Sequence, residues 1–565
     1  MLEKRLVTAL FLAASLGSAS LLYAANFNGA AGQHVLLISI DGMHALDYAN
    51  CVSANTCPTL KALGNTGINY TRTSTSRPSD SFPGINAIVT GGTPKTVGAY
   101  YDVAYDRVLA PPINTTGNGV SGGTCVPGQP NGTRTEYEEG IDIDQTQLTG
   151  GSPLYTNPID GGYLSIDPTK LPRDPYNNCS PVYPWNFIRA NTIFGVIHYE
   201  GGYTAWADKH AAYSVVSGPT GTSKPSNLDD YYAPDINSNI VPLPGVVTAS
   251  GLDCSKMTAN GNDWTTDFDA VKCNDQLKVN AVLSWIQGRT HLGALGGQVP
   301  VVFGMDFQAV SVGEKLVIGT EKGGYMDAAG TPTPNMLGEI KYVDAAIGQM
   351  VSALQSQGLF NQTTIIITAK HGQSPIDTNR FFPIPGPSGN NGMPPSSVLG
   401  PAFLPDSELN QIGPTEDDIS LLWLSPGVST TNAVALLESN AAAAGIGQIF
   451  YGPSVETMYG TPGLPPTGDP RTPDIIVAPN VGVVYTGSKK KQAEHGGFAH
   501  DDTNVMLLVS NPSIKPKTVT TFVETTQVAP TILSILGLSP NLLSAVQQEG
   551  TQPLPGFFFG LPTGN

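Results

Sequence analysis

The stretch His34–Val35–Leu36–Leu37–Ile38–Ser39–Ile40–Asp41–Gly42 decides the fold class. It is a short run of apolar and β-branched residues that ends in Asp-Gly, which is typical of a parallel strand covered by helices on both faces. In open α/β sheets, ligands bind at the carboxyl ends of such strands. The stretch therefore predicts an α/β protein in which Asp41 lies at the ligand-binding edge of the sheet.

Similar runs recur later in the chain, at Val299–Asp306, Thr363–Thr368, Asp474–Ala478 and Val505–Ser510. Between them, apolar residues over Met336–Leu354 recur at steps of three and four, which predicts an amphipathic helix. Strands that alternate with helices favour a largely parallel central sheet.

Two segments rich in Gly, Pro, Asn and Asp interrupt this alternation. The first covers residues 109–274 and holds Cys125, Cys179, Cys254 and Cys273, and the second covers residues 381–470. We expect both to be loop-rich insertions that lie over the active-site face. The catalytic core is then assembled from residues 26–108, 275–380 and 471–565.

The amino terminus has the pattern of an export signal. Lys4 and Arg5 precede an apolar run, and small residues near Ala25 mark a cleavage site, so residues 1–25 are predicted to be a signal peptide. We expect the mature protein to be secreted or periplasmic, with no membrane association after cleavage.

The six cysteines fit three disulfides in an oxidising compartment. Closeness in sequence favours the pairs Cys51–Cys57, Cys125–Cys179 and Cys254–Cys273, although spacing alone leaves other pairings open.

The net charge is −17, with 28 Lys and Arg against 45 Asp and Glu. A nucleic-acid-binding surface normally has the opposite balance, so the composition gives no sign of one. A small anionic substrate would need positive charge placed locally, by metal ions or by a few cationic side chains.

The segment Arg77–Gly84 reads as a tight loop that feeds a helix. Pro83 falls in the first helical turn, where a missing N–H costs nothing. Ser81 falls just before the helix, where its hydroxyl would face unpaired backbone N–H groups and the positive end of the helix dipole. Ser81 is therefore a candidate nucleophile, and a simple N-cap is the alternative.

Several side chains suited to a divalent metal follow predicted strands or lie on a nearby loop. They are Asp41, Asp306, His371 and His495. Carboxylate and imidazole groups are the ligands that hydrolytic metal sites use, and a metal beside Ser81 would activate its hydroxyl.

With these motifs in place, the chain resembles the type I phosphodiesterase/nucleotide pyrophosphatase family of the alkaline phosphatase superfamily. The motifs are Ile38–Gly42, Ser81–Pro83, Val89–Gly91, Lys370–Gly372, Arg471–Ile475, His495–Gly497 and Ala529–Leu533. The resemblance covers about residues 34–105, 275–375 and 470–540. It implies an alkaline-phosphatase-like three-layer sandwich.

The resemblance also implies a mechanism. Ser81 would attack phosphorus and form a phospho-intermediate beside two zinc ions. Asp41 and His371 would bind the nearer ion, and Asp306 and His495 the other.

Three departures from the family pattern alter this site. Lys370 and Val310 stand where the family has an aspartate and a histidine ligand, and Asp102 stands where an asparagine contacts the phosphate. The ammonium of Lys370 could supply the charge of a missing metal, pair with Asp41 and still hold an anion. Three interpretations of the site remain open. It could hold one metal ion beside the lysine, it could use further metal ligands, or it could be a scaffold that no longer catalyses a reaction.

A shorter resemblance links Gly202–Ala205, followed by Lys209 and His210, to the sulfatase segment that grips sulfate. A charged surface strand end is the alternative. Residues 81–85 lack the arginine that formylglycine formation needs, which counts against a sulfatase. The other histidines His34, His44, His198 and His291 are expected to be structural.

These observations predict a secreted, metal-dependent hydrolase of phosphodiesters or related phosphate esters, acting on a small molecule. Ser81 and Lys370 would be catalytic, and Asp102, Lys209 and His210 would contact the substrate. The cofactor would be one or two divalent ions, zinc by preference. The alternatives are a phosphomonoesterase or sulfatase-like hydrolase on the same site, and a decayed anion-binding scaffold.

Overall fold

The computed structural model describes residues 27–138, 162–237, 245–257, 263–295, 297–386, 388–410, 412–486 and 489–557. The predicted signal peptide, residues 1–25, lies outside the described residues.

The core is a mixed sheet, which has nine strands within the described ranges and is largely parallel. Its spatial order is β20 (Lys517–Val519), β2 (Gly67–Ser74), β19 (Asn504–Ser510), β12 (Thr363–Thr368), β1 (His34–Ile40), β9 (Val302–Phe307), β7 (Thr204–Ala207) and β8 (Asp230–Tyr232), with β21 (Val523–Glu524) beside β2. The central strand β1 runs parallel to both β12 and β9, and β19 runs antiparallel to its neighbours. The α/β fold expected from residues 34–42 is confirmed.

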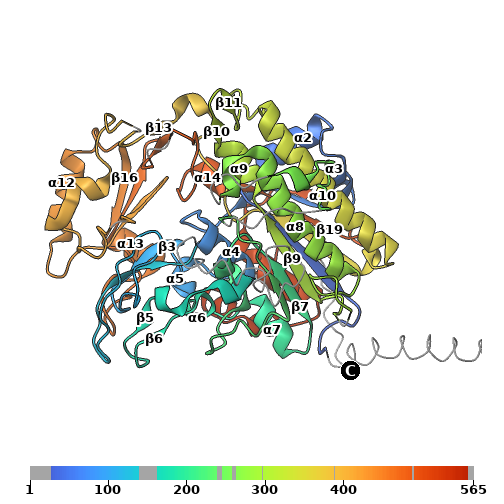
Figure 1. Cartoon of the computed structure of the whole chain (residues 1–565), viewed down its shortest axis with the longest axis horizontal. Coiled ribbons are helices and arrows are strands. Elements are labelled where there is room, and N and C mark those ends of the chain that lie inside the picture. Colours follow the sequence, from blue (N-terminus) through green and yellow to red (C-terminus); the bar gives the residue numbers. More distant parts are fainter. Residues whose placement is uncertain are drawn as a thin grey trace, which may run out of the picture.

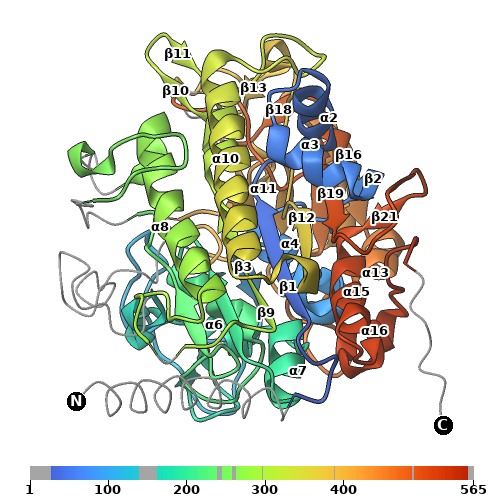
Figure 2. The ribbon, with the colours of Figure 1, turned by 90° about the vertical axis from the view of Figure 1, so that its right-hand side faces the viewer.

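Helices cover both faces of this sheet. Successive side chains of β1 point to opposite faces, and they therefore pack into two separate cores. Val35 and Leu37 pack in one core, and Leu36, Ile38 and Ile40 pack in the other. The first core contains α4 (Ser81–Thr90), α7 (Ile193–Tyr199) and α15 (Val528–Ile535); the second contains α3 (Pro58–Asn65), α8 (Phe268–Ile286) and α10 (Pro334–Ser356). Figure 1 shows α8 and α10 on one side of the sheet and α4 and α7 on the other, and Figure 2 shows α10 next to β1.

The segment 109–274 is less separate from the core than its composition predicts. It contributes β7 and β8 to the main sheet, and α8 begins at Phe268, before the expected boundary. Each of these strands has at most four residues. Strand β7 lies just before Lys209 and His210, where the sequence predicts a strand end. Part of the segment 109–274 therefore belongs to the core sheet.

A second sheet, of four strands within the described residues, lies beside the core. It comprises β14 (Thr415–Glu416), β15 (Ser420–Leu422), β17 (Ile475–Pro479) and β16 (Ile446–Tyr451), and it packs with α12 (Thr430–Ser439). Figure 1 shows it at the left of the molecule. The run Asp474–Ala478, expected in the core, forms β17 of this sheet, because its backbone pairs with β15 and β16. A short apolar run does not specify which sheet it joins.

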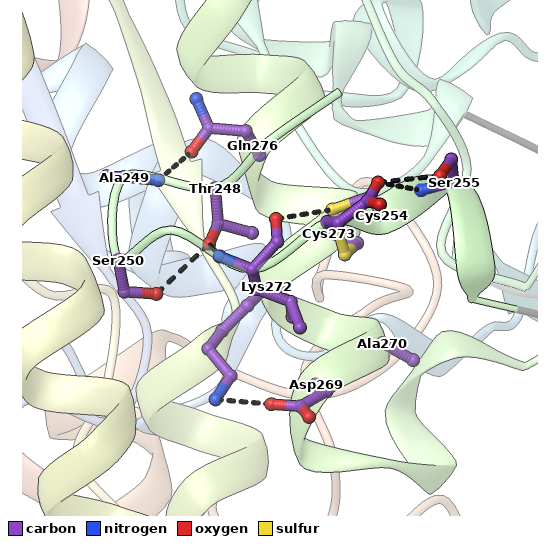
Figure 3. Close-up of a disulfide and its surroundings, with 12 residues drawn as sticks. Thr248, Ala249, Ser250, Cys254, Ser255, Asp269, Ala270, Lys272, Cys273 and Gln276 are labelled. Carbon is purple, nitrogen blue, oxygen red and sulfur yellow. Dashed lines mark hydrogen bonds and ion pairs between the residues drawn. A yellow bond between two sulfur atoms is a disulfide. The ribbon is translucent and has the colours of Figure 1, made fainter. Parts of the chain in front are cut away.

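All three expected disulfides are present, joining Cys51 to Cys57, Cys125 to Cys179, and Cys254 to Cys273. Figure 3 shows the last of these, which ties the loop around Thr248 to the first turns of α8. In the described part of the chain, no helix has the length and apolarity needed to cross a membrane.

Candidate active site

Ser81 is the first residue of α4, and Asp80 is the N-cap. Asp80 Oδ2 accepts a hydrogen bond from the backbone N–H of Phe82 at 3.1 Å. The sequence-based prediction that Ser81 lies just before the helix is wrong by one residue. The N-cap is Asp80, whose carboxylate accepts the capping hydrogen bond. The Ser81 hydroxyl, which is fully buried, is left to contact other side chains.

Gly84 sets how closely α4 approaches the end of β12. A Cβ atom at this position would collide with the backbone carbonyl of Lys370. Glycine in the Ser-Phe-Pro-Gly sequence therefore allows the first turn of α4, and with it Ser81, to pack against the segment that carries Lys370 and His371.

Lys370 joins the ends of three neighbouring strands. Its Nζ atom lies 3.1 Å from Asp41 Oδ2 and 3.1 Å from Asp306 Oδ2, and 4.0 Å from Asp208 Oδ1. The Tyr213 ring lies beneath it, with its centroid 4.4 Å from Nζ. The sequence-based hypothesis that Lys370 pairs with Asp41 agrees with this geometry.

The charges in this cluster follow from burial and proximity. Burial lowers the pKa of Lys370, but Asp306, Asp41 and Asp208 outweigh it, so the pKa is raised and the group stays an ammonium. Burial raises the pKa of Asp41, but Lys370 and other cations hold it below its usual value. Burial and the neighbouring Asp41 raise the pKa of Asp306 well above normal.

Two members of this cluster were not anticipated from the sequence. Gln308 donates hydrogen bonds from Nε2 to both Asp41 Oδ2 and Asp306 Oδ2. Asp208 follows β7 and accepts a hydrogen bond from Trp206 Nε1 at 2.8 Å. Gln308 lies two residues after Asp306, and Asp208 directly precedes Lys209. Closeness in sequence to these two candidate site residues is the signal that could have identified them.

The Ser81 hydroxyl lies between an imidazole and an ammonium. Its Oγ atom is 3.1 Å from His371 Nε2 and 3.4 Å from Lys209 Nζ. The other imidazole nitrogen, His371 Nδ1, lies 2.9 Å from the carbonyl oxygen of Gly372. Burial lowers the pKa of His371 well below its usual value, so the ring is neutral. Lys209 also forms an ion pair with Glu138.

His495 lies on the other side of His371. The two rings are stacked with their centroids 4.0 Å apart, and His495 Nδ1 is 3.3 Å from Asp80 Oδ1. Burial lowers the pKa of His495 to about 3. Tertiary structure thus connects the loop of His495 to the N-cap of α4.

Asp102 and His210 line a cavity of about 500 Å³ that also reaches Lys209, Gln308 and His495. The backbone N–H of Asp102 donates to Asp80 Oδ2 at 3.1 Å. His210 Nδ1 lies 3.1 Å from Asp235 Oδ2. Asp102 and His210, both predicted to contact the substrate, therefore lie on the cavity wall. The same wall includes Lys209, which contacts Ser81.

The zinc ions that the family resemblance implies do not fit the four predicted ligands. The Oδ2 atoms of Asp41 and Asp306 already face the ammonium of Lys370 and the amide of Gln308. The side chain of Val310, at the expected histidine position, is fully buried in an apolar core. The Lys370 ammonium, which lies between the carboxyl groups of Asp41 and Asp306, would repel a zinc ion bound at the same place.

The structure brings a different set of metal-capable groups together. Among the described residues, His44, Asp47 and Glu314 are the group of three whose ligand atoms lie within 4.8 Å of one another, so this buried group could hold a metal. His44 Nδ1 lies 2.9 Å from Asp47 Oδ2 and 3.1 Å from Glu314 Oε1. Burial lowers the pKa of His44, but these carboxyls outweigh it and raise the pKa. His44 thus has partners that the sequence did not indicate.

Comparison with solved structures shows what the fold resembles. Murine ectonucleotide pyrophosphatase/phosphodiesterase 5 superimposes with a TM-score of 0.50 and 14% identity, covering 94% of this chain and 99% of that chain. An inactive variant of the murine protein, in complex with AMP, gives a TM-score of 0.50 and 14% identity, covering 93% and 98%. The human protein gives a TM-score of 0.50 and 12% identity, covering 90% and 96%. At this identity, the likeness shows a shared fold.

Sequence comparison gives the family. No curated protein matches the chain. The type I phosphodiesterase/nucleotide pyrophosphatase family model matches residues 35–128 and 324–502. These ranges include Asp41, Ser81, Lys370, His371 and His495. The chain belongs to the type I phosphodiesterase/nucleotide pyrophosphatase family.

Proposed function

We propose that this protein hydrolyses a phosphodiester or a related phosphate ester, with Ser81 as the nucleophile. The observation that carries the proposal is the position of the Ser81 hydroxyl, at the first residue of α4 and within reach of His371 Nε2 and Lys209 Nζ. Family membership supports phosphate esters as the substrate class.

The surroundings of Ser81 suit an anionic tetrahedral group. Ser81 lies at the N-terminus of the buried helix α4, where the positive end of the helix dipole favours an anionic phosphoryl group. The Lys209 ammonium adds a full charge: burial lowers its pKa, but Glu138 outweighs this and raises it. These groups stabilise charge that develops as phosphorus is attacked.

The reaction runs in two displacements. Ser81 Oγ bonds to phosphorus while the bond to the first alcohol breaks, which gives a phosphoserine diester and the free alcohol. Water then attacks the phosphorus, the bond to Ser81 Oγ breaks, and a phosphate monoester is released. Asp102 and His210, on the cavity wall, would contact the rest of the substrate.

The resemblance also implies one or two zinc ions. Because Lys370 and Gln308 face the oxygens that would bind them, no step of this proposal depends on a metal. The three disulfides and residues 1–25 support export to a secreted or periplasmic location.

A phosphomonoesterase or sulfatase-like activity is the second candidate, because the contact of Lys209 with Ser81 Oγ matches what an anion grip requires. Rates of hydrolysis of chromogenic diester, monoester and sulfate ester substrates would show which of the three activities the protein prefers.

The direct test compares diester hydrolysis by the wild type, Ser81→Ala and Ser217→Ala. Ser217 is a matched control, equally buried, and its Oγ has no hydrogen-bond partner within the described residues. We expect a loss of at least about a thousandfold in Ser81→Ala alone. Absence of activity in the wild type with every substrate would instead favour a decayed anion-binding scaffold.

A further inference from the structure

We propose that Ser81 and His371 form a metal-independent catalytic dyad, in which His371 is the general base rather than a metal ligand. The inference rests on the proposed function and specifies how the same site works. It starts from the arrangement of the two nitrogens of one imidazole.

The hydrogen-bond partners of His371 determine where its proton lies. Nδ1 is 2.9 Å from the carbonyl oxygen of Gly372, and a carbonyl can only accept a hydrogen bond. The proton therefore lies on Nδ1, and the lone pair of Nε2 faces Ser81 Oγ at 3.1 Å. This is the relation between base and nucleophile in serine hydrolases, with a backbone carbonyl as the group that orients the base.

The positive charge of the site comes from lysines. Lys370 lies 3.1 Å from the carboxylate oxygens of both Asp41 and Asp306, and Gln308 donates to the same two oxygens. Lys209 lies 3.4 Å from Ser81 Oγ and can move to an oxygen of the bound phosphate. Two ammonium groups thus occupy the region where the family resemblance implies two metal ions.

The proton balance of the reaction closes with these residues. His371 Nε2 takes the Ser81 proton as Oγ bonds to phosphorus, and the leaving alcohol takes a proton from solvent. In the second displacement, the attacking water loses one proton as the Ser81–phosphorus bond breaks, and Ser81 Oγ recovers the proton that His371 holds. His371 ends neutral, and the phosphate monoester and one proton are released.

The first experiment measures diester hydrolysis by the full chain before and after dialysis against a strong chelator, with zinc measured in both samples. We expect the rate to change by less than about twofold, and His371→Ala to lose about 10²- to 10⁴-fold, the usual contribution of a general base. Loss of activity on chelation that added zinc restores would overturn the inference.

The second experiment does not depend on activity. Zinc binding is followed by thermal shift and calorimetry in the wild type, in His371→Ala and in a double variant, Lys370→Asp with Val310→His, which restores the ligand types implied by the family. We expect the double variant alone to gain zinc binding that depends on His371. Zinc bound by the wild type and lost in His371→Ala would overturn the inference.

These readouts separate the two proposals. If zinc binds equally to the wild type and to His371→Ala, His371 is not its ligand, and the dyad is supported. The candidate site for that zinc is the group formed by His44, Asp47 and Glu314. If no ester is hydrolysed under any condition, the proposed function fails, and the wild-type zinc measurements still decide whether His371 is a metal ligand.

Discussion

The ammonium of Lys370 lies 3.1 Å from the carboxylate of Asp41, at the point where the parallel strands β12 and β1 end side by side. Both side chains are almost fully buried. A buried ion pair of this kind is costly to break, because the partner that remains is a charge with no solvent to stabilise it. The pair therefore links the stability of the fold to the chemistry of the site.

Replacing Lys370 with Met should test this link. The change removes the cation shared by Asp41, Asp306 and Asp208, and we expect the free energy of unfolding to fall by about 3 kcal/mol or more. Denaturant unfolding measures it, with Lys61→Met as a more exposed control expected to change stability by less than about 0.5 kcal/mol. Equal stability of Lys370→Met and the wild type would show that the pair contributes little.

Replacing Gly84 with Ala tests the close approach of α4 to Lys370. The added methyl group would collide with the Lys370 carbonyl, so we expect a loss of about 1–3 kcal/mol together with reduced hydrolysis, because Ser81 shifts. Gly338→Ala in α10 is the matched control. Its new Cβ meets nothing within 4 Å, and the change should stabilise the helix by about 0.5–1 kcal/mol. Similar effects of both variants would contradict the argument.

Lys209→Met should weaken substrate binding. The Lys209 ammonium lies 3.4 Å from Ser81 Oγ, and a hydrogen bond to a charged group contributes about 1.5–3 kcal/mol, or about 10- to 100-fold in KM. Lys315→Met is the control, because Lys315 lines the same cavity at another point. Steady-state kinetics with a chromogenic diester measures both variants. An unchanged KM in Lys209→Met would remove Lys209 from the anion site.

Glu408 should make stability depend on pH. Burial raises the pKa of this carboxyl from 4.5 to about 8, so the folded state binds a proton that the unfolded state releases. Its stabilising contribution is complete below the unfolded pKa and is lost as pH rises through about 8.

Glu408→Gln should therefore remove this pH dependence and become more stable than the wild type at high pH. Free energies of unfolding measured from pH 4 to 9 give the comparison. Parallel curves for the two proteins would show that Glu408 is ionised in the folded state.

Several features were readable in the sequence because they depend on local pattern. The strand His34–Ile40, the helix around Met336–Leu354 and the loop before α4 all carry periodicity or turn chemistry of their own. Closeness in sequence favoured the disulfide between Cys125 and Cys179, with a sequence separation of 54, and the structure confirms that pair. The departure at Lys370 was visible as a single unexpected residue type.

Other features depended on contacts that no local pattern encodes. Strand β8 has three residues and is stabilised by its pairing with β7. Gln308 became part of the site because its amide reaches two carboxylates that come from different strands. The position of Gln308, two residues after Asp306, marked it only as a neighbour of a candidate ligand, and its hydrogen bonds depend on how β1 and β9 lie side by side.

By itself, the sequence determined the α/β class and the residue types available at the strand ends, because these depend on composition and on short-range order. Tertiary structure alone decided what those residue types do together. It placed the Lys370 ammonium between Asp41 and Asp306, and it turned Nε2 of His371 towards Ser81. The physical reason is that charge and proton position depend on distances of a few ångströms between groups far apart in the chain, which only packing sets.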